Sequence, residues 1–200
     1  MASDLIREVS TMEKKQTIST RRLVLAALLA ALTVVGSALR ITLPLEIAGT
    51  TSFHLGNIMC ALSGILLGPW LGGLAAGMGS AIYDMMNPLY ISEAWITFLF
   101  KGAYAVAAGL IARTGGKEIT YPKSILATAV GAAAYAALYL LKSFYYNGIL
   151  LHGLTVEAAA ITVVAKLPAT IFNAVVAILF APILAKSISV ALKKNHLSLA

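Results

Sequence analysis

Six apolar stretches follow one another along the chain, and short polar segments separate them. A helix needs roughly 20 apolar residues to cross about 30 Å of hydrocarbon, and most of these stretches reach that length. The pattern therefore predicts an all-α membrane protein, a bundle of about six transmembrane helices. The predicted spans are residues 23–41, 53–67, 70–86, 93–112, 124–146 and 157–185.

The polar segments between the spans carry turn signals. We expect a polar loop at residues 42–52 and a tight turn at Gly68-Pro69, because Gly and Pro interrupt helices. The six spans use nearly the whole chain and leave no room for a soluble domain. We therefore predict one membrane domain, with a cytoplasmic tail at 1–20, the bundle at 21–186 and a second cytoplasmic tail at 187–200.

The distribution of charge predicts the orientation of the bundle. Lys and Arg occur in both tails and in the segment 113–123, whereas the segments 42–52, 87–92 and 147–156 contain none. Because Lys and Arg mark the cytoplasmic side, both termini are predicted to be cytoplasmic. The first apolar run is too long for a cleavable signal, and no small-residue cleavage site follows it, so we expect it to be retained.

The composition supports the same class. The chain is 60% hydrophobic and 12% charged, whereas soluble domains are about 25% charged. Its net charge of +7 is explained by the Lys and Arg residues that mark the cytoplasmic segments. We therefore predict that the chain lies in a lipid bilayer and does not bind nucleic acid.

Small residues are concentrated in two of the predicted spans, where they let helix backbones approach closely in lipid. The third span contains five glycines between Gly68 and Gly79, and the first contains alanines at four-residue spacing. The glycine run is not a phosphate-binding loop, because no Gly-Lys-Ser/Thr follows it. The sequence predicts no cofactor.

Two lysines lie inside predicted spans, and charges there are candidates for function. Lys101 is about 12 Å into the fourth span and Lys166 about 13 Å into the sixth, at 1.5 Å per residue. Both spans run inward from the outer side in the predicted topology. The two ammonium groups are therefore expected at similar depth.

Each lysine belongs to a polar stripe on one helix face. Two stripes share the spacing i, i+4, i+8, i+11, and a third follows the fifth span to its outer end. The stripes are Glu93, Thr97, Lys101 and Tyr104; Thr162, Lys166, Thr170 and Asn173; and Tyr135, Tyr139, Lys142 and Tyr146. Together they predict a polar pocket with aromatic walls, open to the outer side.

Residues at the outer ends of other spans are expected to complete this pocket. The loop between the first two spans, which begins near Arg40, is expected to cover it. The further candidates are His54 and Asn57, and Asn87 and Tyr90. His54 and His152 lack other metal-ligating neighbours, so no metal site is predicted.

An alternative explanation of the lysines is structural. A lysine in a span can snorkel toward the interface, or pair with a buried acid and so fasten two helices together. Asp84 and Glu157 are the available partners. In that case the lysines stabilise the fold and do not contact a ligand.

Three stretches resemble the S components of energy-coupling factor (ECF) transporters, the small membrane subunits that capture vitamins in bacteria. The resemblance covers residues 21–186. The stretches read LAALLAAL, HLGNIMCALSGILLGPWLGGLAAGMGSAIYD and NPLYISEAWITFLFKG. Within the family, the chain looks closest to the hydroxymethylpyrimidine or pyridoxine group; riboflavin, pantothenate and other vitamins remain alternatives.

The resemblance implies the site, the partners and the location. Substrate binds near the outer side of the bacterial cytoplasmic membrane, where the stripes lie. A coupling transmembrane subunit and two ATP-binding subunits supply the energy, and the loaded S component rotates to release its vitamin inward. The residues implied to face the coupling subunit are Ala26, Ala27, Ala30 and Ala31, with either pair possible.

Two other classes of membrane protein have sequence features of their own. An intramembrane serine protease would need a nucleophile such as Ser80 in a GxSxG context with a paired histidine, and that context is absent. We therefore expect no enzyme activity. A self-sufficient permease would show inverted repeats, and none is convincing.

Overall fold

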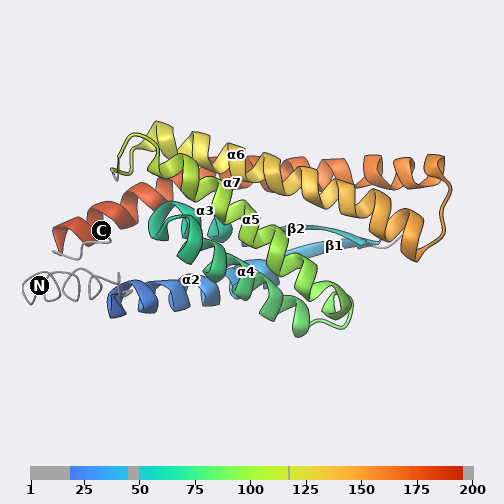
Figure 1. Cartoon of the computed structure of the whole chain (residues 1–200), viewed down its shortest axis with the longest axis horizontal. Helices are drawn as coiled ribbons and strands as arrows, with labels where there is room; N and C mark the ends of the chain where they lie inside the picture. The colour runs from blue at the N-terminus through green and yellow to red at the C-terminus, as the bar shows by residue number, and fades with distance from the viewer. Residues whose placement is uncertain (1–18, 45–49, 117, 196–200) are drawn as a thin grey trace, which may run out of the picture.

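The structure is a computed structural model that describes residues 19–44, 50–116 and 118–195. In this part the chain forms six α-helices, one π-helix, one 3-10 turn and one β-hairpin (Figure 1). The elements are α2 (Thr20–Ala38), β1 (Arg40–Pro44), β2 (Thr50–His54), α3 (Gly56–Leu67), α4 (Pro69–Met85), η1 (Ile91–Glu93), α5 (Ala94–Arg113), α6 (Tyr121–Lys142), η2 (Ser143–Leu151) and α7 (Val156–Lys194).

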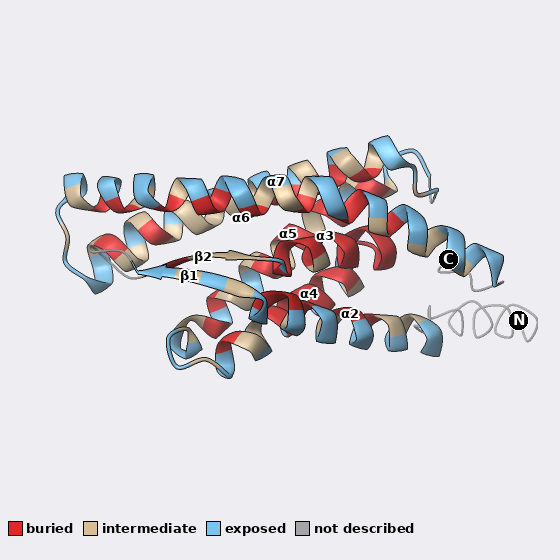
Figure 2. Ribbon diagram, turned by 180° about the vertical axis from the view of Figure 1, so that it is seen from behind, coloured by how far each residue is buried: buried red, intermediate tan, exposed pale blue. Residues whose placement is uncertain are grey.

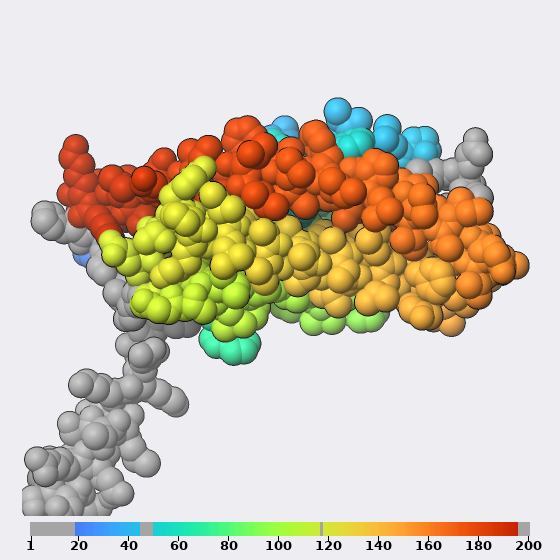
Figure 3. Space-filling model, turned by 90° about the horizontal axis from the view of Figure 1, so that it is seen from above, coloured from blue at the N-terminus to red at the C-terminus, as the bar shows by residue number. Residues whose placement is uncertain are grey.

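The helices run roughly along the long axis of the molecule. Helix α2 begins and α7 ends at the same end, whereas the hairpin and η2 lie toward the other (Figure 1). Seen from above, α6 and α7 lie side by side (Figure 3). The basic α5–α6 connection lies at the same end as the start of α2 and the end of α7 (Figure 1). Their membrane side stays a prediction.

Four helical segments are long and apolar enough to cross a membrane: 20–38, 91–113, 121–151 and 156–194. Helix α3 has only 12 residues, about 18 Å, and 11 of them are buried. It lies in the centre of the bundle, surrounded by other helices (Figure 2). Helix α4 has 17 residues, about 26 Å. The structure therefore supports a helical membrane protein, whereas the predicted count of six spans is not confirmed.

The segment predicted as a loop forms an antiparallel hairpin, so the mostly helical bundle also contains one two-stranded sheet. Strand β1 pairs with β2 from Arg40 opposite His54 to Pro44 opposite Thr50. Helix α2 ends at Ala38, before the predicted end at residue 41. β-Branched residues such as Ile41 and Thr51 favour this extended pairing over a loop. Residues 45–49 of the predicted loop lie outside the described residues.

Helix α7 also differs from its predicted span. It runs unbroken through Pro168 and Pro182 to Lys194, beyond the predicted end at residue 185 and into the predicted tail. At about 58 Å it is longer than the hydrocarbon core is thick. Proline is tolerated in such helices because neighbouring groups satisfy the freed backbone carbonyls. The predicted N-terminal tail lies almost wholly outside the described residues.

The small residues bring α2, α3 and α4 into close contact, as predicted. A Cβ atom at Gly72 would collide with the carbonyl group of Ser63 in α3, and one at Gly79 with that of Ala30 in α2. Gly68 adopts a φ of 84° between α3 and α4, a conformation that favours glycine. These approaches pack the backbones closely because no side chain separates them.

Candidate binding cavity

A cavity of about 350 Å³ lies among the hairpin, α3, α4, η1, α5, α6, η2 and α7. Its volume is within the range of about 300–1,000 Å³ that is common for small-molecule sites. Ten of the twelve predicted substrate-binding residues line it. They are His54, Asn57, Tyr90, Glu93, Thr97, Lys101, Tyr139, Lys166, Thr170 and Asn173.

Lys101 is buried, with 4% of its surface exposed, and reaches the cavity from α5. Its ammonium group donates a hydrogen bond to Oδ1 of Asn57 on α3. The same nitrogen lies 3.9 Å from the centroid of the Tyr135 ring. An amide oxygen and an aromatic face therefore stabilise this buried charge, and its hydrogen bond to Asn57 uses one of its three donors.

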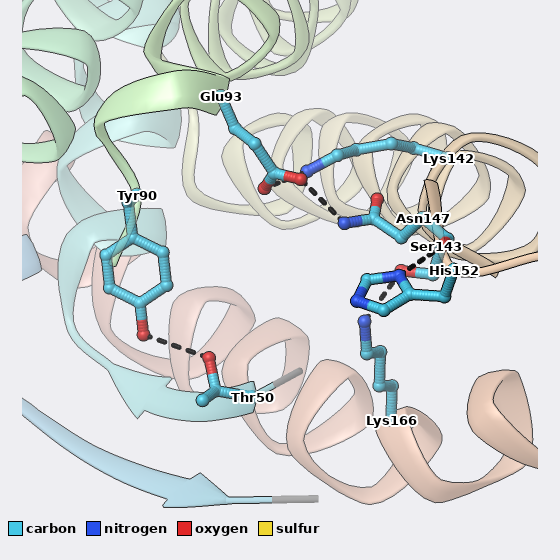
Figure 4. A network of polar contacts seen from close by, with 8 residues as sticks. All are labelled: Thr50, Tyr90, Glu93, Lys142, Ser143, Asn147, His152 and Lys166. Atoms are coloured by element: carbon cyan, nitrogen blue, oxygen red, sulfur yellow. Dashed lines mark hydrogen bonds and ion pairs between the residues drawn. The ribbon is translucent and has the colours of Figure 1, made fainter. Parts of the chain in front are cut away.

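Lys166 is equally buried and reaches the cavity from α7. Its ammonium group donates to the Ser143 hydroxyl across 3.3 Å, and lies 5.7 Å from the Tyr139 ring centroid. Figure 4 shows the amine directed toward Ser143, the first residue of η2, and His152, which follows η2. These contacts are longer than those of Lys101, so Lys166 is held less tightly.

Three tyrosines form a stack along the wall of the cavity. Tyr135 is stacked between Tyr104 and Tyr139, with ring centroids 6.0 Å and 5.9 Å apart. Tyr135 and Tyr139 line the cavity and Tyr104 does not. The stack offers flat apolar faces beside two ammonium groups, which suits a planar ring with polar substituents.

An ion pair that joins two helices, the alternative role considered for Lys101 and Lys166, is made by Lys142 instead. Lys142, at the end of α6, pairs with Glu93 at 2.5 Å, and Asn147 donates to the other Glu93 oxygen at 2.6 Å (Figure 4). Within the described residues, neither Lys101 nor Lys166 has a carboxylate at ion-pair distance. The alternative in which these lysines pair with Asp84 or Glu157 therefore finds no support among the described residues.

Asn173 holds the hairpin against α7. Its Oδ1 accepts from the His54 backbone N–H at 2.9 Å, and its Nδ2 donates to the Ser52 carbonyl at 2.8 Å. Phe53 packs edge-on against Phe172, with centroids 5.0 Å apart. Because both ends of the Asn173 amide bind β2, this residue positions the hairpin over the cavity.

The hairpin is also fastened from the opposite side. The Tyr90 hydroxyl lies 3.3 Å from the hydroxyls of both Thr50 and Ser52. The Arg40 guanidinium lies over the rings of Tyr83 and Tyr90, at 4.2 and 4.8 Å. The hairpin therefore closes this side of the cavity, as the covering loop was expected to do.

His54 enters the cavity as a neutral group. Burial lowers its pKa well below its usual range, and the positive charges of Lys101 and Arg40 add to the effect. Its Nδ1 accepts from the Gly56 backbone N–H at 3.2 Å. Among the described residues no cluster of three or more metal-ligating side chains occurs.

Two predicted residues do not line the cavity. Tyr104 is completely buried and packs against Gly131, because the face of α5 that carries it turns into the α5–α6 interface. Asn87 fixes the turn after α4: its Oδ1 accepts from Leu89 N–H at 3.0 Å and its Nδ2 donates to Tyr83 at 3.2 Å.

Several lining residues were missed by the site prediction. Ser143 and Asn147 of the π-helix η2 line the cavity, as does His152, which directly follows η2. The i→i+5 turns of a π-helix change which residues share a face, so Tyr146 of the predicted stripe does not line the cavity. Lys142, which belongs to the third predicted stripe, and Asp84, which was considered as an acidic partner for the lysines, also line the cavity.

The sequence matches the family described as ECF-type riboflavin transporter, S component, over residues 17–190. The chain belongs to this family of S components. The predicted family is confirmed, whereas the predicted hydroxymethylpyrimidine or pyridoxine group is not. A relative from Pyrococcus woesei, named as an uncharacterized protein in the gap 3′ region, is 30% identical over 118 residues, or 59% of this S component and 74% of the relative.

Proposed function

We propose that this S component captures a small vitamin or vitamin precursor from the outer side of the membrane, in the cavity beneath the hairpin. The observation that carries the proposal is the tyrosine stack with two buried amines beside it. A planar ring gains contact area on the tyrosine faces, and the amines donate hydrogen bonds to its substituents.

The favoured ligands carry a single small ring, such as hydroxymethylpyrimidine or pyridoxine. This preference rests on the resemblance and on the paired tyrosines Tyr135 and Tyr139. Riboflavin is the second candidate, because the matched family carries its name. Pantothenate and other vitamins are further alternatives.

The proposed partners are a coupling transmembrane subunit and two ATP-binding subunits. The described residues contain one alanine pair that is available for such a contact. Ala26 is buried, whereas Ala27 and Ala31 are exposed on α2. They share one helix face with Val24, Leu28 and Val35, which are also exposed. We therefore assign the partner-facing role to Ala27 and Ala31.

The proposed orientation places both termini in the cytoplasm of a bacterial cell. Single-cysteine variants in the Cys60→Ala background test it with a membrane-impermeant thiol reagent on intact cells. A cysteine at His152 should react from outside, and one at Lys123 should react only after the cells are opened. The reverse pattern would contradict the orientation.

The experiment that tests the function is mass spectrometry of small molecules that co-purify with the protein in detergent. A bound vitamin or precursor is the expected result. Uptake assays with and without the coupling and ATP-binding subunits then separate an ECF importer from a self-sufficient permease. Uptake by this chain alone would support the permease.

A further inference from the structure

Positive charge exceeds negative charge around the cavity. Of the described residues that line it, four carry cationic side chains and two carry carboxylates. The cations are Arg40, Lys101, Lys142 and Lys166, and the acids are Asp84 and Glu93. The imidazole of His54 is neutral and does not change this balance.

One of the two carboxylates is already used. Glu93 accepts from Lys142 at 2.5 Å and from Asn147 at 2.6 Å, one at each oxygen. Asp84 then remains as the counter-charge for Arg40 and both buried lysines. The side chains that line the cavity therefore carry more positive than negative charge, and burying unpaired ammonium groups is costly.

Lys166 is the least compensated of these cations. Lys101 is held by Asn57 and lies close to the Tyr135 face, and Arg40 is sandwiched by two rings. Lys166 has one 3.3 Å contact with a hydroxyl group and a ring centroid 5.7 Å away. Its ammonium can donate three hydrogen bonds, so it is suited to a charged acceptor.

We infer that the ligand of this cavity carries an anionic group, a carboxylate or a phosphate, which binds Lys166 while its remaining body lies against the tyrosines. This inference rests on the proposed capture function but departs from the neutral ligands favoured there, because it narrows the substrate to acids. The ligand supplies the negative charge that the protein lacks. Neutral vitamins of the same shape leave Lys166 without a counter-ion and bind less tightly.

Ligands matched in shape but not in charge test the inference. Titration calorimetry on the purified full chain compares pyridoxine with 4-pyridoxic acid, which replaces a hydroxymethyl group with a carboxylate, and with pyridoxine 5′-phosphate. A second pair is pantothenol and pantothenate. In the set that binds most tightly, the anion should bind about ten- to a hundredfold more tightly than the alcohol. The acid and phosphate arms identify which anion is preferred.

The variant Lys166→Met should weaken binding of the anion about ten- to a hundredfold more than binding of the alcohol, so that most of the preference for the anion is lost. Lys193→Met, at an exposed site near the end of α7, is the matched control and should preserve the preference. Equal affinity for alcohol and anion in the unmodified protein would overturn the inference, even if the variant does not fold. Equal weakening of both ligands by Lys166→Met would also overturn it.

Failure of the inference is distinct from failure of the capture function. If the anions do not bind but a neutral vitamin co-purifies, the ligand class is wrong and the capture function stands. If neither the panel binds nor any small molecule co-purifies, both proposals are wrong.

Discussion

Two regions of this S component use opposite means of holding helices together. Where α3 and α4 pack against each other, α2 and the glycine-facing side of α5, glycines bring backbones into contact and almost no side chain lies between them. Around the cavity, side chains span the gap and polar contacts join the hairpin, α5, α6 and α7. The first region should therefore be intolerant of added volume, and the second should be sensitive to lost partners.

The difference follows from the surroundings. In lipid, helices gain little from burying apolar side chains against each other, so close packing and hydrogen bonds are the available forces. The glycine junction uses close packing and leaves no space. The cavity uses polar contacts and keeps about 350 Å³ open. The following predictions are ordered by their expected effect on the stability of the isolated protein.

The largest loss of stability is expected for Gly64→Ala. A Cβ atom there would collide with the backbone carbonyl of Ala105 on α5, and backbone cannot move aside as a side chain does. We expect a cost of about 1–3 kcal/mol or more, measured as a lower melting temperature in detergent. Gly102→Ala is the control, because its Cβ would meet only the Gly73 carbonyl, at 3.4 Å. Equal melting of the two variants would contradict the close-contact argument.

Breaking the ion pair beside the cavity should have the next largest effect. Lys142→Met leaves Glu93 with Asn147 as its remaining partner, at a cost on the order of 2 kcal/mol for this mostly buried pair. Adding Glu93→Gln should recover most of the melting temperature, because it removes the uncompensated charge. Lys193→Met breaks an exposed pair and should change little. No recovery in the double variant would show that the pair is not the cause.

A smaller change in stability but a clear loss of binding is expected for Lys101→Met. The substitution keeps length, removes a buried charge and leaves Asn57 without its donor. Losing a charge-assisted hydrogen bond of roughly 1.5–3 kcal/mol should weaken ligand binding about ten- to a hundredfold. Affinity and melting temperature are measured on the same sample. Intact binding with a lowered melting temperature would make Lys101 structural.

The smallest effect on stability is expected for the double variant Ala27→Leu and Ala31→Leu. Both positions are exposed on α2, so the isolated protein should melt and bind ligand as before, whereas uptake by the full transporter should be lost. Ala26→Leu is the contrasting variant, because it adds volume at a buried site and should lower the melting temperature. Loss of binding together with uptake in the double variant would show that α2 does not face the partner.

The sequence predicted much of the cavity because helical spacing is regular. Lys101 and Lys166 line the same cavity, and eight other predicted residues line it as well. Binding by these residues stays a prediction. Asn173 is a predicted substrate contact and lines the cavity, yet both its Oδ1 and its Nδ2 are hydrogen-bonded to the backbone of β2. A single sequence offers no signal for that, because the partner is backbone more than 100 positions away.

What the sequence by itself determined was the helical class, the small-residue contacts and the polar stripes, since these follow from composition and from the 3.6-residue period. Tertiary structure decided three further matters: that residues 40–44 and 50–54 pair as strands, that η2 adopts π geometry, and that Ala26 turns inward while Ala27 faces out. Each depends on which neighbouring element lies against a face. A regular period defines the faces of a helix, and only the packed neighbours determine which face is buried.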